Sequence, residues 1–210
     1  MGTVFGRGVT LQVAFLASLV LSPTTPLTMS VMWAAACLPA TFHNLSLPGA
    51  EIVSLSATLV TNYSASVPAT DRFTQPPVEL QNASFCNITV SYTHLGQNDA
   101  LVVEAWLPAA RGWNGRLQAV GGGGFVAGRS APARSAMAGA IADGYATVTT
   151  DAGLGTAADP TTWALLSPGN VNLYALQNLA SVSLEDEASK QRDPPFFQRF
   201  DRRRREWLFL

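Results

Sequence analysis

Four consecutive glycines, Gly121 to Gly124, follow a short apolar stretch in this chain. Glycine has no Cβ, so a loop of this kind adopts positive φ and lets its backbone N–H groups come close to a bound atom. Amides held in that way stabilise an oxyanion or bind a phosphate. A flexible turn that only joins two elements would have the same composition, so the flanking elements decide between the two interpretations.

A strand and a helix are predicted on either side of the glycines. The apolar stretch Leu117–Val120 has strand character, and Ser130 is a suitable helix N-cap with Pro132 in the first turn behind it. The alanine-rich residues 133–142 favour a helix, and Gly144 is a typical residue to end it. The glycines therefore connect a strand to a helix, the context in which Gly-rich loops bind anions.

A second strand is predicted over residues 145–150, which are β-branched and aromatic. Strand, helix and strand together form a βαβ unit with a parallel strand pair and a right-handed crossover. Ligands in such sheets bind at the carboxyl ends of the strands, which is where the glycines and Asp151 fall. A further helix is predicted over residues 170–184.

Upstream of the glycines the sequence predicts antiparallel β structure. Residues 51–63 and 85–92 alternate between apolar and polar side chains, and residues 100–107 follow a turn at 96–99. The last two of these strands form a hairpin. Residues 70–81, with two adjacent prolines, are predicted to be a loop.

The N-terminus has the features of a secretion signal. Arg7 gives a basic start, residues 9–21 are mostly apolar but too few to span a bilayer, and Ala34 to Ala36 offer a small-residue cleavage site. An N-terminal helix or a membrane anchor is the alternative. We expect residues 1–36 to be a targeting segment and the mature chain to be secreted, extracellular and without membrane contact.

Export is also indicated by sequons and by the cysteines. The four N-glycosylation candidates are Asn44, Asn62, Asn82 and Asn87. Cys37 and Cys86 are a disulfide candidate in an oxidising compartment, although the spacing is also compatible with two buried thiols that never meet. Two cysteines without a CxxC spacing give no zinc site, and we expect no metal in this chain.

Composition sets further limits on function. The 210 residues carry a net charge of −1, so nothing in the overall charge indicates a nucleic-acid partner. The C-terminal residues differ from the rest, because 13 of the 27 charged residues lie between Glu185 and Glu206. We interpret residues 187–210 as an atypical charged tail outside the native fold, rather than as a nucleic-acid patch or a localisation signal.

Several separated motifs follow one another between Cys37 and Asp186. In chain order they are Phe85–Tyr92, Trp113–Arg116, Gly121–Gly124, Gly144–Thr147, Thr150–Gly153, Asn170–Tyr174 and Ser181–Leu184. This order resembles the fungal tannase and feruloyl esterase family over residues 37–186. The resemblance implies a partial α/β-hydrolase fold, comprising the N-terminal strands, the Gly-rich loop and the βαβ unit, without the lid and the C-terminal half. The implied reaction is the hydrolysis of phenolic-acid esters such as gallates or hydroxycinnamates.

The family's catalytic residues have no counterparts in this sequence. Members use a serine nucleophile in a Cys-Ser-x-Gly-Gly motif, with an Asp and a His further along, and a calcium site in the lid. Neither cysteine here precedes a serine, and Gly128–Pro132 fails the G-x-S-x-G pattern at its last position. We therefore expect the triad and the calcium site beyond the end of this chain, no cofactor within it, and no esterase activity from it alone.

The histidines do not replace the missing base. His43 and His94 are interpreted as surface or structural residues, because His43 precedes the first sequon and His94 ends a strand at a turn. Leu154 stands where the family usually has His, which weakens any role for its loop. Gly121 to Gly124 remain as oxyanion-loop candidates, and a small phenolic ester would be the substrate of a full-length protein.

Two functions of other classes remain open from the sequence. Gly122–Ala127 fits the loose dinucleotide pattern G-x-G-x-x-G/A, and Asp151 ends the next strand, where a ribose-binding acid would lie. This would make the chain a nicotinamide-dinucleotide-binding oxidoreductase domain. The other alternative is a non-catalytic secreted module, which would have to tolerate an exposed parallel sheet edge.

Overall fold

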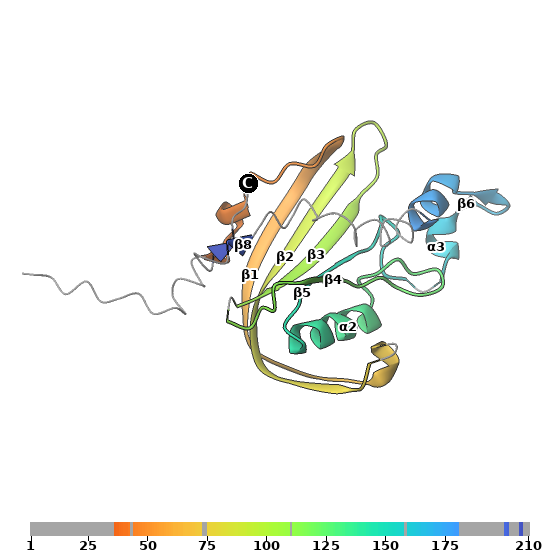
Figure 1. Ribbon diagram of the computed structural model, residues 1–210. Helices are drawn as coiled ribbons and strands as arrows, with labels where there is room; N and C mark the ends of the chain where they lie inside the picture. Colours follow the sequence, from red (N-terminus) through yellow and green to blue (C-terminus); the bar gives the residue numbers. More distant parts are fainter. Residues whose placement is uncertain are drawn as a thin grey trace, which may run out of the picture.

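The computed structural model describes residues 36–42, 44–72, 75–109, 111–157, 159–180, 200–201 and 206–207. This part of the chain is a mixed α/β fold built on a five-stranded sheet with few helices (Figure 1). The predicted α/β class is confirmed at that level. The targeting segment up to Ala35, His43 and residues 181–184 lie outside the described residues.

The sheet combines an antiparallel part with one parallel pair. Its strands are β1 (Ala50–Val67), β2 (Val78–His94), β3 (Leu101–Pro108), β4 (Leu117–Ala119) and β5 (Ala146–Thr150). The spatial order is β1-β2-β3-β5-β4, so β1 and β4 form the two edges. Strands β1, β2, β3 and β5 pair antiparallel in that order, whereas β4 pairs parallel to β5. The predicted β2–β3 hairpin and the parallel pair are both present.

The predicted loop over residues 70–81 is wrong at its C-terminal end. A short 3-10 helix, η2 (Ala69–Asp71), follows β1, and β2 already begins at Val78. Val78 pairs with Val67, and both Val67 and Leu80 are buried in the core. The two prolines before Val78 concealed this strand start, because Pro stops a strand but does not prevent the next residue from entering one.

The βαβ unit forms as its local signals predict. Helix α2 (Ala131–Ala142) begins where the Ser130 hydroxyl accepts the N–H of Ala133 at 3.3 Å. At the other end Gly144 has φ of 80°, its N–H donates to Ile141, and the Tyr145 N–H donates to Ala140. This is a Schellman arrangement, and it turns the chain directly from α2 into β5.

The two faces of the sheet have separate cores. On one face α2 packs through Met137 against Phe85 and Trp106, whose rings stack with centroids 4.5 Å apart. On the other face the segment before β1, including η1 (Pro39–Phe42), covers β2 and β3. The Cys37–Cys86 disulfide joins that segment to β2, so the disulfide candidate is confirmed.

The region after β5 differs from the single helix predicted over 170–184. A short helix, α3 (Thr161–Ala164), leads into the antiparallel pair β6 (Leu165–Ser167) and β7 (Asn170–Val171). The helix begins only at residue 173, where the Asn172 side chain accepts the N–H of Ala175. Asn is a strong N-cap, so the helix starts after Asn172 rather than at the predicted residue 170.

Two residue pairs of the charged tail are described. They form β8 (Phe200–Asp201) and β9 (Glu206–Trp207), which pair antiparallel and belong to no other sheet. The interpretation of residues 187–210 as foreign to the fold therefore stays a prediction, as does the division of the chain into three parts.

Candidate functional site

The glycine run lies at the carboxyl end of β4, beside the carboxyl end of β5. Val120 continues the β4–β5 ladder by donating its N–H to Val148 at 2.8 Å, and the chain then leaves the sheet. All four glycines are exposed, and Phe125 after them is 56% exposed. Because these strands are parallel, the residues that follow β5 come to the same edge of the sheet.

The loop closes on itself through two backbone hydrogen bonds. The Gly122 N–H donates to Ala127 at 2.6 Å, and the Val126 N–H donates to Gly123 at 3.2 Å. A Cβ on Gly122 would lie 2.0 Å from the carbonyl oxygen of Val126, so this fold of the loop requires glycine there. The Gly122 amide is used inside the loop, whereas the amides of Gly121, Gly123 and Gly124 donate to no acceptor among the described residues.

The loop returns to the sheet through Gly128 and Arg129. A Cβ on Gly128 would lie 2.4 Å from the Thr150 carbonyl oxygen and 2.5 Å from the Thr149 hydroxyl. The Arg129 N–H donates to that same hydroxyl at 3.1 Å. The return arm of the loop is thus pressed directly onto β5, which fixes where the exposed glycines lie.

We expect Gly128→Ala to destabilise the protein by about 1–3 kcal/mol, because the added methyl has no space without moving β5. Urea unfolding followed by tryptophan fluorescence measures this loss. Gly123→Ala is the matched control, since a Cβ at Gly123 meets nothing within 4 Å. Equal stability of the two variants would show that the return arm is not held against β5.

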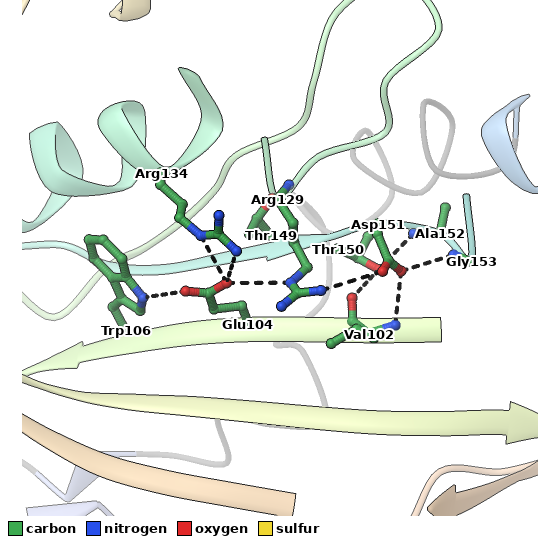
Figure 2. A network of polar contacts seen from close by, with 10 residues as sticks. All are labelled: Val102, Glu104, Trp106, Arg129, Arg134, Thr149, Thr150, Asp151, Ala152 and Gly153. Atoms are coloured by element: carbon green, nitrogen blue, oxygen red, sulfur yellow. Dashed lines mark hydrogen bonds and ion pairs between the residues drawn. The ribbon is translucent and has the colours of Figure 1, made fainter. Parts of the chain in front are cut away.

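Behind the loop lies a buried charged network (Figure 2). Glu104 of β3 and Asp151 after β5 are 4% and 5% exposed. Arg129 lies between them, with Nε 3.4 Å from one Glu104 carboxylate oxygen and Nη1 3.4 Å from Asp151. Arg134 of α2 reaches the same Glu104 oxygen at 3.3 Å, and the Trp106 indole N–H donates to the other at 3.0 Å. Two buried carboxylates are thus compensated chiefly by arginines that flank the start of α2.

Two strained backbone positions lie at the same place. Arg129 and Ala152 both have φ of 54°, a left-handed conformation that costs non-glycine residues of order 1 kcal/mol or more. The Asp151 carboxylate helps to hold the second of these turns, because one of its oxygens accepts the N–H groups of Val102 and Gly153, each at 2.9 Å. Such strain persists only where surrounding contacts over-determine the conformation, as the network does here.

Asp151 is not available as the ribose-binding acid of the dinucleotide alternative. One carboxylate oxygen accepts two backbone N–H groups and the other faces Arg129. The helix after the glycines also begins only at Ala131, and Ser130 already caps it. Dinucleotide binding needs a carboxylate that is free to bind the ribose and an uncapped helix start beside the glycines. This geometry provides neither.

His94 is a structural histidine, as its position at the end of β2 suggested. Its Nδ1 lies 2.6 Å from Asp99 Oδ2, and the Tyr174 hydroxyl donates to the same oxygen at 2.6 Å. Asp99 Oδ1 accepts the His94 N–H and the Thr93 hydroxyl. Burial alone would raise the pKa of Asp99, but the hydrogen bonds it accepts hold that pKa well below its usual range. Burial and the bond to Asp99 raise the pKa of Tyr174.

Asp99 therefore makes stability depend on pH. Because its pKa is lower in the folded chain, its contribution is complete above the unfolded value near pH 4 and is lost as the pH falls further. We expect Asp99→Asn to lower the free energy of unfolding by about 2 kcal/mol at pH 7 and by progressively less as the pH falls below 4. Urea unfolding across this range measures the difference, and Tyr174→Phe should cost about half as much at pH 7. If the difference in unfolding free energy between the parent and Asp99→Asn grew as the pH fell, this assignment would be wrong.

The glycosylation candidates differ in their surroundings. Asn44, Asn62 and Asn82 are exposed, whereas Asn87 is half-buried in the inner strand β2 with its Oδ1 inaccessible. Within the described residues no three His, Cys, Asp or Glu side chains are grouped so as to hold a metal ion. No helix in the described part of the chain is both long and apolar enough to cross a membrane.

The Glu104–Arg129–Asp151 network was not predicted from the sequence. The available signal was a lone charged residue in an otherwise apolar strand, Leu101–Pro108, since a carboxylate there must be either exposed or paired. Leu154, at the position where the family has His, is buried against Trp163 and Ala175. That side chain therefore contributes to packing.

Comparison with known proteins gives partial matches. No family model matches the chain. It is 38% identical over 145 residues to a probable feruloyl esterase from Arthroderma benhamiae, covering 68% of this chain and 25% of that protein. It is also 38% identical over 64 residues to tannase from Aspergillus oryzae, covering 29% and 11%. The solved structure of tannin acyl hydrolase from Aspergillus niger has 27% identity and a TM-score of 0.49, covering 77% of this chain and 28% of that one.

The chain spans a quarter or less of the length of the curated relatives that it matches. The candidate site is an exposed glycine loop at the carboxyl ends of two parallel strands in an α/β fold. Over the matched residues the chain is a relative of the fungal tannase and feruloyl esterase family, and the resemblance seen in its motifs is confirmed there.

Proposed function

We propose that this chain forms the N-terminal part of a secreted serine-type carboxylic ester hydrolase acting on phenolic-acid esters. In this proposal the described part is a partial α/β-hydrolase fold, and its glycine loop supplies one half of an oxyanion hole. The relatives named feruloyl esterase and tannase support the reaction class. The serine, its histidine base and the orienting acid would come from sequence beyond residue 210.

One observation carries the proposal: an exposed glycine backbone held in a fixed place at the carboxyl end of β4. The amides of Gly121, Gly123 and Gly124 have no acceptor among the described residues, while the return arm of the loop is fixed to β5 and to the buried network. Donors that are fixed before the reaction lower a barrier more than mobile ones, because no energy is spent on orienting them.

The chemistry follows from that geometry. A serine attacks the ester carbonyl after a histidine removes its proton, and the carbonyl oxygen becomes an oxyanion. In α/β-hydrolases one oxyanion donor is the amide after the nucleophile, and the other comes from the loop after an early strand. Losing one donor costs on the order of 3 kcal/mol in the barrier. The glycine loop is therefore necessary but cannot catalyse the reaction by itself.

Secretion is part of the proposal. The Cys37–Cys86 disulfide supports it, because such bonds form and persist in oxidising compartments and are rare in the cytosol. The apolar N-terminal stretch and the sequons support the same route. The mature protein would then be an extracellular glycoprotein that acts on a small phenolic ester.

The test replaces the corresponding N-terminal segment of the Arthroderma benhamiae relative with this chain's matched residues. The chimera should hydrolyse methyl ferulate or methyl gallate. Gly123→Pro removes one amide donor and should lower kcat by about 100- to 1,000-fold with little change in KM. Gly123→Ala keeps the amide, has open space for its methyl, and should retain activity.

Two results would refute parts of this proposal. Equal activity of the proline and alanine variants of the chimera would exclude the Gly123 amide as a donor. Turnover of either ester by the purified 210-residue chain would show that the nucleophile is within it, against the absence of a Cys-Ser-x-Gly-Gly or G-x-S-x-G motif.

A further inference from the structure

Strand β1 is a long edge strand with almost no charge. It covers 18 residues, and Glu51 is its single ionisable acid or base other than a tyrosine. No described strand pairs with its outer edge. Open edges of this kind template aggregation, and proteins blunt them with charged side chains, prolines, bulges or a cover. An edge with so few charges depends on the other forms of protection.

Two asparagines lie at facing irregularities of the β1–β2 ladder. The register shifts between Val60 and Tyr63 and again between Tyr63 and Ala65. Asn62 of β1 and Asn82 of β2 lie at these shifts with φ of 56° and 51°, and both are exposed. Bulges bend a strand and turn a side chain out of the regular alternation, so both amides are presented to solvent.

Each of these asparagines begins a sequon. The hydroxyl residues two positions later are Ser64 and Ser84. The Ser64 hydroxyl also accepts the N–H of Asn82 at 3.0 Å, which links the two sites across the strand pair. A left-handed bulge explains why asparagine is tolerated at both positions, but it does not require a hydroxyl residue after each of them.

Asn87 contrasts with this pair although it has the same sequence signal. It is paired with Thr58 of β1 on one side and Trp106 of β3 on the other, within the face on which α2 packs. Its Oδ1 is buried without a partner among the described residues. A sugar on this amide would have to emerge beside the stacked Phe85 and Trp106 rings, which the folded sheet does not accommodate.

We propose that Asn62 and Asn82 carry N-linked glycans that shield the open edge of β1, and that Asn87 stays unmodified. In the transfer step Asn Nδ2 attacks the anomeric carbon of a lipid-linked oligosaccharide pyrophosphate. The C–N bond forms, the C–O bond to the pyrophosphate breaks, the amide loses one proton, and the lipid pyrophosphate leaves. This inference rests on the proposed secretion of the chain.

The experiment expresses the full 210-residue chain in a eukaryotic secretory host, with its own N-terminus and also behind a leader of that host. Glycan release in heavy-oxygen water followed by peptide mapping identifies each modified asparagine. Asn62 and Asn82 should be occupied in most molecules and Asn87 in almost none. A chain exported by the host leader but bare at Asn62 and Asn82 would overturn this inference, whereas a failure of export with the native N-terminus alone would count against the proposed secretion.

Matched variants test the shielding role. Asn62→Gly removes the side-chain amide that would carry the glycan, and glycine readily adopts the positive φ of this position. Ser84→Ala removes the second sequon while keeping Asn82. The double variant should show a several-fold larger aggregated fraction by size-exclusion chromatography at equal concentration. Ser84→Thr, which preserves the sequon, should behave like the parent. Unchanged aggregation of a double variant that peptide mapping shows to lack glycans at residues 62 and 82 would overturn the shielding role.

Discussion

Arg129→Ala is expected to lower the free energy of unfolding by about 3 kcal/mol. Removing the guanidinium leaves Asp151 buried without its cation and leaves Glu104 with Arg134 alone. Breaking a buried ion pair from one side costs 3–5 kcal/mol, because an uncompensated charge stays in the interior. We place the effect at the lower end because Arg129 is 17% exposed and its contacts are 3.4 Å long. Urea unfolding at pH 7 measures the loss.

Three further variants separate the causes of this effect. Arg129→Lys keeps the charge but cannot contact two carboxylates as a fork, so it should recover part of the loss. Arg129→Gly should be less damaging than Arg129→Ala, because glycine relieves the strain at φ 54°. Arg134→Ala should cost under about 1 kcal/mol, since Arg134 is 44% exposed. If Arg134→Ala proved as costly as Arg129→Ala, Arg129 would not be the central cation of the network.

Loss of Arg129 should also loosen the glycine loop. The loop is tied to β5 by the Arg129 N–H and by the close approach of Gly128, and the Arg129 side chain anchors this arm. Faster amide hydrogen exchange over residues 121–128 in Arg129→Ala, with unchanged exchange in β2, would show local loosening rather than global destabilisation. Under the proposed function, such loosening would reduce the fixed geometry on which oxyanion stabilisation depends.

The parts of the fold that sequence reasoning predicted are those with local determinants. Ser130 caps α2, and Gly144 ends it, because each interaction reaches only a few residues along the chain. The parallel pairing of β4 and β5 followed from the helix between them. These features depend on local chemistry, so a single sequence contains them.

The parts that sequence reasoning missed depend on distant partners. The early start of β2 is fixed by pairing with β1 across η2, and no signal within residues 70–81 indicates it. The contact of Glu104 with Arg129 joins β3 to the loop before α2, 25 positions away. A buried carboxylate could be anticipated from the apolar strand around it, but its cation could be any of several arginines until the sheet order was known.

Replacing both Cys37 and Cys86 by alanine is expected to cost about 4 kcal/mol, the largest effect we predict. The cysteines are separated by 49 positions, and releasing a loop of that length restores chain entropy to the unfolded state. Both side chains are buried in the core of the second face, so lost packing adds to the effect. Urea unfolding should show a lower midpoint and a steeper m-value, because the unfolded chain without the cross-link exposes more surface.

Reduction provides the matched comparison for this double variant. A thiol reductant should destabilise the parent chain towards the level of the double variant and should leave the double variant itself unchanged. The segment before β1 should become the first to exchange its amides, because it loses the disulfide that joins it to β2. If the double variant were as stable as the parent, Phe42 and its apolar neighbours alone would hold this segment on the sheet. The disulfide would then not be needed to close the second core.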